Sequence, residues 1–322
     1  MRMADAYEFF GLVQKLNEPE STWAETLDQI KLALTNDTRR IQTEALITEA
    51  SLFLLMVRAL LNVTLSDNAE KLLIIFSHAL RYNNGLVLQK QTALSPLDSP
   101  RGLRTALLRI LDLMKTKAST VELALRCLSD VQACEAGFQW ASKDIAFRTI
   151  EKVIDCSRRH ALDSSVREQL CVFLANLSAT GTVEIRRHIF STAGTLLILC
   201  ASFATNPSSL NPRLADCALS ALHNLCFDDP DMALDLFRLK ALDAAQKVLQ
   251  VFEIQRETAL AALTILADIA IIAGPDLILP VHFVKLAYDM ARQHASEELY
   301  VIASTKALER MTKSEEGQRE FL

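Results

Sequence analysis

The order of hydrophobic and polar residues repeats along this chain and predicts a series of similar helices. One eight-residue pattern occurs six times, at residues 56–63, 124–131, 170–177, 218–225, 262–269 and 304–311. Its fifth position is always leucine and its eighth is always apolar, while its seventh is always polar. Successive leucines lie 68, 46, 48, 44 and 42 residues apart. A helical unit that recurs at this period is typical of an α-solenoid, in which each repeat packs against its neighbours.

The first fifty residues contain helical patterns that do not fit this register. The segment 17–19 interrupts the first pattern with a proline, and Ser21 is a candidate N-cap for a second helix. The second pattern places four apolar side chains on one face, namely Trp23, Leu27, Ile30 and Leu34. Atypical terminal helices cover the apolar edge of the first repeat in such folds. We therefore expect residues 1–50 to form an N-terminal helical cap and residues 51–322 to form about six repeats.

The longest interval between two copies of the pattern contains an insertion at about residues 82–102. Asn83, Asn84 and Gly85 favour a helix end, and two Ser-Pro pairs follow them at residues 95–96 and 99–100. A residue before proline avoids the helical backbone conformation. We expect a surface loop here, whose Ser-Pro pairs are also candidate sites for proline-directed kinases.

Composition and charge favour helix and argue against nucleic acid as the partner. Glycine and proline are scarce, at eight residues each, and half of the residues are hydrophobic. The formal net charge is −5, whereas a nucleic-acid binder normally presents a basic face. Because the chain has only two tryptophans, we do not expect a platform for stacking bases either.

The cysteines and the apolar segments indicate the compartment. Seven cysteines occur without any Cys-x-x-Cys pair, mostly among apolar helical residues, so we expect buried, reduced thiols and no zinc site. This favours an intracellular, reducing compartment, the cytoplasm first and an organellar assembly as the alternative. The N-terminus lacks the apolar core of a signal peptide. The most apolar run, residues 259–281, contains Asp268 and is broken at Gly274, which argues against a transmembrane span.

One copy of the pattern carries a family resemblance. Residues 219–249 contain a third-helix motif that ends at Asn224, a short loop with Pro230, and two further helical segments. This layout resembles a consensus armadillo repeat, and residues 129–154 follow it as well. The resemblance covers about residues 51–322. It implies an all-α fold, a right-handed armadillo-like α-solenoid.

The chain also departs from the armadillo consensus in two ways. Lys240 replaces the glycine that usually lies between the first and second helices of a repeat. Asp130, Asp268 and Arg310 replace the asparagine of the third helix. These changes indicate a divergent member and leave HEAT-like geometry open in places.

The resemblance also implies where a partner binds. In armadillo proteins the third helices line a concave groove, and their asparagine side chains hold the backbone of an extended peptide. By register, the candidates here are Asn62, Asn176 and Asn224. Alternatively, an asparagine near a helix end only satisfies the polar groups of the local loop.

The third position of the pattern distinguishes between kinds of partner. It holds no tryptophan, which argues against recognition of nuclear-localisation peptides in the manner of importin alpha. Arg58, Arg126 and Lys306 occupy it near the ends of the series, where they could bind an acidic, extended partner. Alternatively, these cations are solvated and contribute little. The full candidate groove comprises Arg58, Asn62, Arg126, Asp130, Asn176, Ser220, Asn224, Asp268, Lys306 and Arg310.

The sequence contains no recognisable catalytic motif. The six histidines show no metal-ligand spacing, and no nucleophile elbow, P-loop or dinucleotide fingerprint occurs. We expect His223, beside Asn224, to be a polar surface residue. Two basic clusters, at residues 148–160 and 186–188, are candidate patches for phosphate or an acidic partner, although nearby acids could pair with them. We therefore expect no enzyme activity, no cofactor and no metal.

These patterns favour a non-catalytic scaffold or adaptor that binds a segment of another protein along the groove. The first alternative is a permanent structural subunit of a flagellar, cytoskeletal or organellar assembly, which would contact several other subunits. The second alternative is a regulator of a small GTPase or a chaperone, although no particular residue points to that role.

Overall fold

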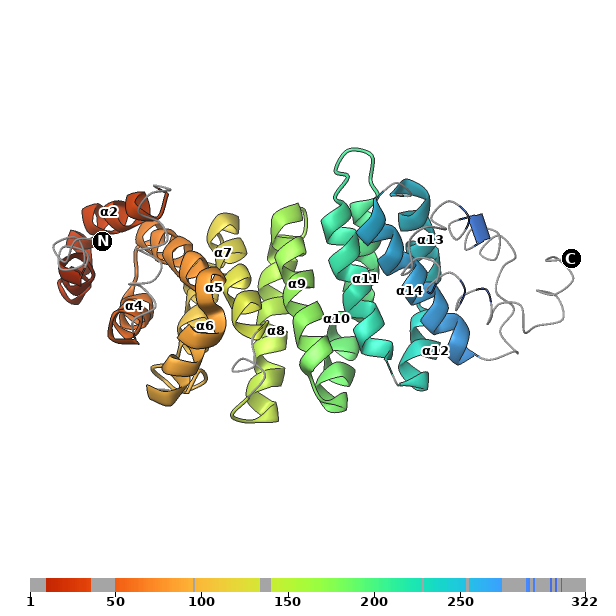
Figure 1. Cartoon of the computed structure of the whole chain (residues 1–322), viewed down its shortest axis with the longest axis horizontal. Coiled ribbons are helices and arrows are strands. Elements are labelled where there is room, and N and C mark those ends of the chain that lie inside the picture. Colours follow the sequence, from red (N-terminus) through yellow and green to blue (C-terminus); the bar gives the residue numbers. More distant parts are fainter. Residues whose placement is uncertain are drawn as a thin grey trace, which may run out of the picture. The chain divides into compact units, whose positions relative to one another are not determined.

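The computed structural model describes residues 10–35, 50–94, 96–133, 140–227, 229–252 and 255–273, with single helical positions beyond them at 288, 289, 292, 302, 305 and 308. Every regular element in the described ranges is a helix, as Figure 1 shows. The chain divides into two compact units, residues 1–177 and residues 178–322, and each is described by itself.

The described part of the first unit starts with helical residues 10–14, which two short 3₁₀ turns and a series of α-helices follow. These elements are η1 (Lys15–Asn17), η2 (Glu20–Thr22), α2 (Trp23–Thr35), α4 (Ala50–Asn62), α5 (Ser66–Leu94), α6 (Leu103–Leu113), α7 (Ala118–Gln132), α8 (Lys143–Arg159) and most of α9 (Ser164–Thr180). Helices two places apart in the series pack together, since α5 contacts α7, α4 contacts α6, and α6 contacts α8. This stacking of neighbours is typical of a repeat fold.

The amphipathic helix that the sequence predicts near the N-terminus is confirmed. The side chains of Trp23, Leu27, Ile30 and Leu34 are all buried, and α2 packs against α5. The helix begins at Trp23, after the turn η2, and not at a Ser21 cap. The indole Nε1 of Trp23 donates a hydrogen bond of 2.9 Å to the carbonyl oxygen of Glu18. This bond holds the segment that precedes α2 against the first turn of the helix.

The insertion is shorter than the sequence predicts. We expect a loop from about residue 82, but α5 continues to Leu94, so this boundary is wrong. Glycine in a helix interior costs only about 1 kcal/mol relative to alanine, and asparagine costs less. The leucines, glutamines and lysine after Gly85 are good helix formers that offset this cost. The helix ends shortly before Pro96, because proline disfavours helical backbone in the residue preceding it.

The second half of the insertion is a compact turn and not an open loop. The backbone N–H of Ser99 donates to the carbonyl oxygen of Pro96 at 3.0 Å, and that of Gly102 donates to Ser99 at 2.9 Å. A Cβ atom at Gly102 would lie 2.2 Å from the carbonyl oxygen of Leu97, so only glycine fits this close approach.

A buried ion pair anchors this turn to the rest of the unit. The carboxylate of Asp98 accepts hydrogen bonds from Nη1 of Arg104 at 2.6 Å and from the backbone N–H of Ala141 at 3.1 Å. The side chains of Arg104 and Asp98 are only 2% and 4% exposed. The guanidinium carbon of Arg104 also lies 3.8 Å from the ring centroid of Trp140, a cation–π contact. The turn is therefore joined to the segment that precedes α8.

The second unit contains α10 (Val183–Ala204), α11 (Pro212–Cys226), α12 (Pro230–Arg238), α13 (Ala241–Val251) and α14 (Arg256–Ala273). Figure 1 shows these helices in green and blue, and α11 packs against both α10 and α14. Three helix starts have side-chain caps, in which Thr182, Asn211 and Asp229 accept from the backbone N–H three residues later. Such caps satisfy N–H groups that have no partner within the helix.

The repeats differ in their number of helices. The pattern-bearing helices, which we call the third helices, are α4, α7, α9, α11 and α14 in the described ranges. Two helices, α12 and α13, lie between α11 and α14, as in an armadillo repeat. In contrast, the described residues between α9 and α11 form the single long helix α10. The repeat that resembles the consensus in sequence thus also has its three-helix layout, while its predecessor is closer to a HEAT-like helix pair.

Lys240 explains why the consensus has glycine between the first two helices. Its backbone adopts the left-handed conformation, with φ 62° and ψ 35°, directly before α13. This conformation costs a residue with a Cβ atom about 1 kcal/mol or more.

We expect Lys240→Gly to raise the free energy of unfolding by about 0.5 to 1 kcal/mol, because the gain in backbone energy exceeds the entropy that glycine loses. Thermal unfolding followed by circular dichroism measures the change. Lys240→Ala is the control, since it removes the same side chain but keeps the Cβ atom. Equal melting temperatures for the two variants would contradict the explanation.

One helix of the second unit resembles a membrane span in composition. By length and composition, α10 could cross a membrane, and 44% of its most apolar window is buried inside the structure. The helix α10 packs against α11 and α13, and its buried side chains include Ile189, Leu197 and Ala201. Core helices of this kind meet the same criterion of length and composition.

Candidate functional site: clefts along the third helices

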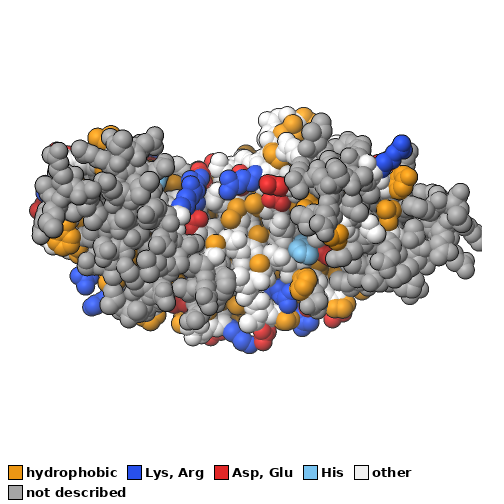
Figure 2. Space-filling model, viewed as in Figure 1, with side chains coloured by type: hydrophobic (Ala, Val, Ile, Leu, Met, Phe, Trp, Pro, Cys, Tyr) orange, Lys and Arg blue, Asp and Glu red, His pale blue; other side chains and the backbone are white. Residues whose placement is uncertain are grey.

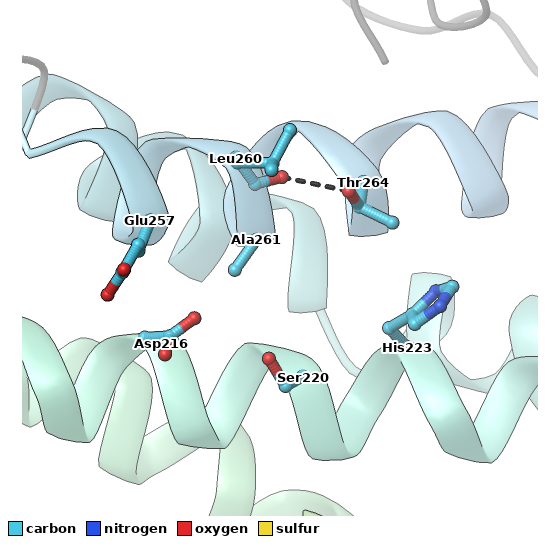
Figure 3. Close-up of a pocket in the computed structure, with 7 residues that line it drawn as sticks. All are labelled: Asp216, Ser220, His223, Glu257, Leu260, Ala261 and Thr264. Atoms are coloured by element: carbon cyan, nitrogen blue, oxygen red, sulfur yellow. Dashed lines mark hydrogen bonds between the residues drawn. The ribbon is translucent and has the colours of Figure 1, made fainter. Parts of the chain in front are cut away.

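In the second unit, the third helices α11 and α14 face each other across a cleft of about 370 Å³. Figure 3 shows its two walls, one from each helix. The residues that line it are Asp216, Ser220 and His223 from α11, and Glu257, Leu260, Ala261 and Thr264 from α14. Residues three or four positions apart share one face of a helix, which is why the members of each wall point the same way.

The acidic end of this cleft is formed by Asp216 and Glu257. Figure 3 shows both side chains at the same end of the cleft, one on each of the two facing helices. Burial raises the pKa of Asp216 above its ordinary value of 3.8, and the negative charge of Glu257 raises it further. A hydrogen bond from Ser220 and the nearby cation Arg213 act in the opposite direction but do not outweigh these causes. The cleft therefore holds a carboxylate whose charge is poorly compensated within the protein.

The other end is closed by a pair of side chains that joins the two third helices. Nδ1 of His223 forms a short hydrogen bond with Oδ2 of Asp268, and the ring of Phe227 lies edge-on to the imidazole at 6.1 Å. Asp268 is the residue that replaces the consensus asparagine in α14. His223 is thus a bridge between neighbouring repeats and not the isolated surface residue that we expect from the sequence.

A second cleft, of about 260 Å³, lies on the third helix α4 of the first unit. Its lining includes Arg58 and Asn62, two of the groove residues that the sequence predicts, together with Glu20 and Trp23 from the N-terminal segment. The carboxylate of Glu20 accepts hydrogen bonds from the backbone N–H groups of Thr64 and Leu65, at 2.9 and 2.8 Å.

Glu20 has a structural role in this second cleft. Burial acts to raise its pKa, but the hydrogen bonds from Thr64, Leu65 and Asn68 together outweigh it and hold the pKa below the ordinary value of 4.5. The carboxylate thereby caps the start of α5 from a distant part of the chain. Its charge is already compensated, in contrast to that of Asp216.

The remaining predicted groove residues have varied surroundings. Arg126 pairs with Glu122 on its own helix, α7. The side-chain amide of Asn176 donates to the carbonyl oxygen of Ser129 at 3.1 Å and so joins α9 to α7. The backbone carbonyl of Asn224 accepts from Arg186 at 3.4 Å. Lys306 and Arg310 lie outside the described residues.

Asp130 is the predicted groove residue with the most unusual electrostatics. Its Oδ2 atom is buried and has no hydrogen-bond partner in the part of the chain that the structure describes. Burial raises the pKa of Asp130 from 3.8 to about 6, although the cations Arg81 and Arg126 partly oppose the shift. The folded protein therefore binds a proton at Asp130 more tightly than the unfolded chain does.

This shift predicts that Asp130→Asn stabilises the protein in a pH-dependent way. The contribution of Asp130 to stability is largest below pH 3.8, falls as the pH rises to about 6, and stays low above it. At pH 7.5 the variant should gain about 1 to 2 kcal/mol, since it removes a poorly solvated charge. Near pH 4 the gain should vanish. Urea unfolding at both pH values measures this, and a gain that is equal at both would contradict it.

Several residues of the α11–α14 cleft were not among the predicted groove residues. Asp216 lies two positions before the pattern in α11, and Glu257 lies five positions before the pattern in α14, so both lie N-terminal to it. A search limited to the eight-residue pattern excludes them. Extending the pattern by five residues toward the N-terminus of each third helix includes both.

The basic cluster at residues 186–188 has structural partners. Nη1 of Arg186 donates to the carbonyl oxygen of Phe227 at 2.7 Å, at the C-terminal end of α11, where cations are favoured. Arg187 pairs with Asp229 at 3.1 Å. In the other cluster, Lys152 pairs with Asp112 and Arg159 pairs with Asp155. On the face that Figure 2 shows, basic side chains lie close to acidic ones at several places.

The cysteines of the described ranges are free thiols. Cys127, Cys156, Cys171, Cys200 and Cys226 are buried, and Cys217 is partly buried. Burial raises the pKa of Cys156 to about 11 and that of Cys226 to about 12, which keeps both protonated and unreactive. Within the described residues, no group of three or more His, Cys, Asp or Glu side chains is arranged to hold a metal ion.

Comparisons with known proteins identify the fold. No protein-family model and no curated protein match the chain. Among solved structures, an engineered protein matches with a TM-score of 0.63 and 17% identity, over 80% of this chain and 95% of its own. A designed armadillo repeat protein matches with a TM-score of 0.59 and 17% identity, over 79% and 98% of the two chains. Computationally designed armadillo repeat proteins for modular peptide recognition match with a TM-score of 0.58 and 18% identity, again over 79% and 98%.

The chain therefore has an armadillo-like repeat fold, an all-α solenoid, as the sequence predicts. At these identities the likeness defines the fold and not the ligand. The right-handed sense of the superhelix stays a prediction.

Proposed function

We propose that this protein is a non-catalytic scaffold that binds a segment of another protein along its third helices. The observation that carries the proposal is the cleft between α11 and α14. Polar side chains from two neighbouring third helices line it, on the face where the armadillo resemblance expects a partner. One of the similar structures is named for modular peptide recognition, which supports a protein ligand for this fold.

The mechanism is the insertion of partner side chains between successive third helices. Five of the six fifth-position leucines are buried in the core and set the spacing of the helices, while the third-position residues Ser220 and Thr264 line the cleft. A bound segment would place one side chain in the cleft and extend along the neighbouring helices. Affinity would then come from several such contacts in series.

The arrangement of Ser220, His223 and Asp268 argues for binding and against catalysis. A serine nucleophile needs its hydroxyl on the histidine that activates it. Figure 3 shows the Ser220 hydroxyl on the Asp216 side of the cleft, with no hydrogen bond between Ser220 and His223. The His223–Asp268 pair therefore serves to join two repeats.

Site-specific photo-crosslinking in the native cells tests the proposal. A photoreactive phenylalanine analogue replaces Thr264, inside the cleft, and in a control it replaces Lys247, which is exposed on α13. We expect Thr264 to crosslink to one contiguous segment of one protein, and Lys247 to give no such product. Crosslinks from Lys247 to several proteins in fixed ratio, with none from Thr264, would overturn the proposal in favour of a built-in structural subunit.

A further inference from the structure

We propose that the α11–α14 cleft receives one lysine or arginine side chain of the partner segment. This inference rests on the proposed function and names the chemistry of the ligand at that site. It follows from the size of the cleft, the order of polar and apolar groups along its walls, and its charge.

The size of the cleft fits one long side chain. Small-molecule pockets have volumes of roughly 300 to 1,000 Å³, and this cleft, at about 370 Å³, lies at the lower end. A helix needs a groove about 10 Å wide along its whole length, which is far larger. An extended segment that inserts a single side chain matches the space between two third helices.

The walls of the cleft match the two parts of a basic side chain. Leu260 and Ala261 provide apolar surface for the methylene stem, which lysine and arginine bury while their charged heads stay polar. The carboxylates of Asp216 and Glu257 lie at one end, where they can accept charge-assisted hydrogen bonds from the head group. An anionic side chain would instead meet two like charges at that end.

The two carboxylates are also arranged at the expense of stability. Their facing charges repel each other, and the Ser220 hydroxyl and Arg213 offset this only in part. A cation between them would relieve the repulsion. A metal ion is a poor candidate for that cation, because no group of three or more potential ligands occurs among the described residues. A carboxylate in a cleft whose charge is only partly compensated is typical of a binding site.

The sequence-based expectation of an acidic partner does not apply to this cleft. That expectation rests on Arg58, Arg126 and Lys306, and none of these three residues lines it. The positive charge of Arg126 is, moreover, already paired with Glu122. Charge complementarity therefore favours a partner that places a basic side chain in the α11–α14 cleft.

The test is a selection of random dodecapeptides displayed on phage against the intact protein. We expect the retained peptides to share one lysine or arginine at a fixed position. Replacing that residue by its neutral isostere, norleucine for lysine or citrulline for arginine, should lower the affinity at least about tenfold. The double variant Asp216→Asn/Glu257→Gln should lower the affinity for the parent peptide by a similar factor, with little further loss for the isostere peptide.

The matched control changes the net charge equally on exposed acids of the same unit. The variant Asp231→Asn/Asp243→Asn lies on α12 and α13, outside the cleft, and should leave the affinity within about twofold at physiological salt. The cleft variant should also melt at the same or a higher temperature than the parent protein, because it removes repulsion.

The outcomes separate this inference from the proposed function. Peptides anchored by neutral or acidic residues, or an equal loss of affinity in the two double variants, would overturn the basic-anchor inference and leave a peptide-binding scaffold in place. A selection that retains no peptide at all would overturn both.

Discussion

Arg104→Met should lower the free energy of unfolding of the first unit by about 3 to 5 kcal/mol. Removing one member of a buried ion pair leaves the other charge without compensation, and this costs far more than the pair itself contributes. Of its hydrogen bonds within the described residues, Asp98 would keep the one from the backbone of Ala141, in surroundings where its side chain is 4% exposed. The contact between Arg104 and the ring of Trp140 would be lost as well.

Urea unfolding followed by tryptophan fluorescence measures this effect selectively, because both tryptophans, Trp23 and Trp140, belong to the first unit. Arg159→Met is the control, since Arg159 pairs with Asp155 at the surface, with 50% and 65% of the side chains exposed. Its cost should be below about 1 kcal/mol. Adding Asp98→Asn to Arg104→Met should restore part of the loss by removing the unpaired charge. Equal costs for the two arginine variants would show that the buried pair does not anchor the turn.

Leu222→Ala should lower the stability of the second unit by about 3 kcal/mol. Leu222 is the fifth-position leucine of α11 and has no exposed surface. Its truncation loses apolar burial and leaves a cavity, which together cost about 2 to 5 kcal/mol for a leucine in a core. Because α11 packs against both α10 and α14, the cavity would weaken the contacts of one repeat with its neighbours on both sides.

Amide hydrogen exchange in residues 178–273 follows this loss, since the second unit has no tryptophan. Leu199→Ala is the matched control, because Leu199 is in the same unit and on a helix but is 58% exposed. Its cost should be below about 0.5 kcal/mol. If exchange accelerated equally in both variants, the pattern leucines would not be the residues that define the repeat core.

The sequence alone determined the repeat fold of this protein. A leucine every 42 to 48 residues in most of the chain, inside an amphipathic pattern, can be buried only if similar helices stack in register. The five pattern leucines within the continuous helices are indeed buried, namely Leu60, Leu128, Leu174, Leu222 and Leu266. The sequence also showed that Lys240 replaces the consensus glycine, and the structure shows that its backbone is left-handed.

Only the tertiary structure decided which side chains meet. The distance from His223 to Asp268 in sequence is a full repeat, and only the packing of α11 on α14 brings the two together. The same packing sets Asp216 against Glu257, and its physical consequence, a carboxylate with a raised pKa, depends on burial that periodicity cannot specify. The pairing of Arg104 with Asp98 is similar, because the sequence predicts only a surface loop around Asp98. Helical periodicity determines which face of each helix is buried, whereas pairs across that face depend on how neighbouring helices are set against each other.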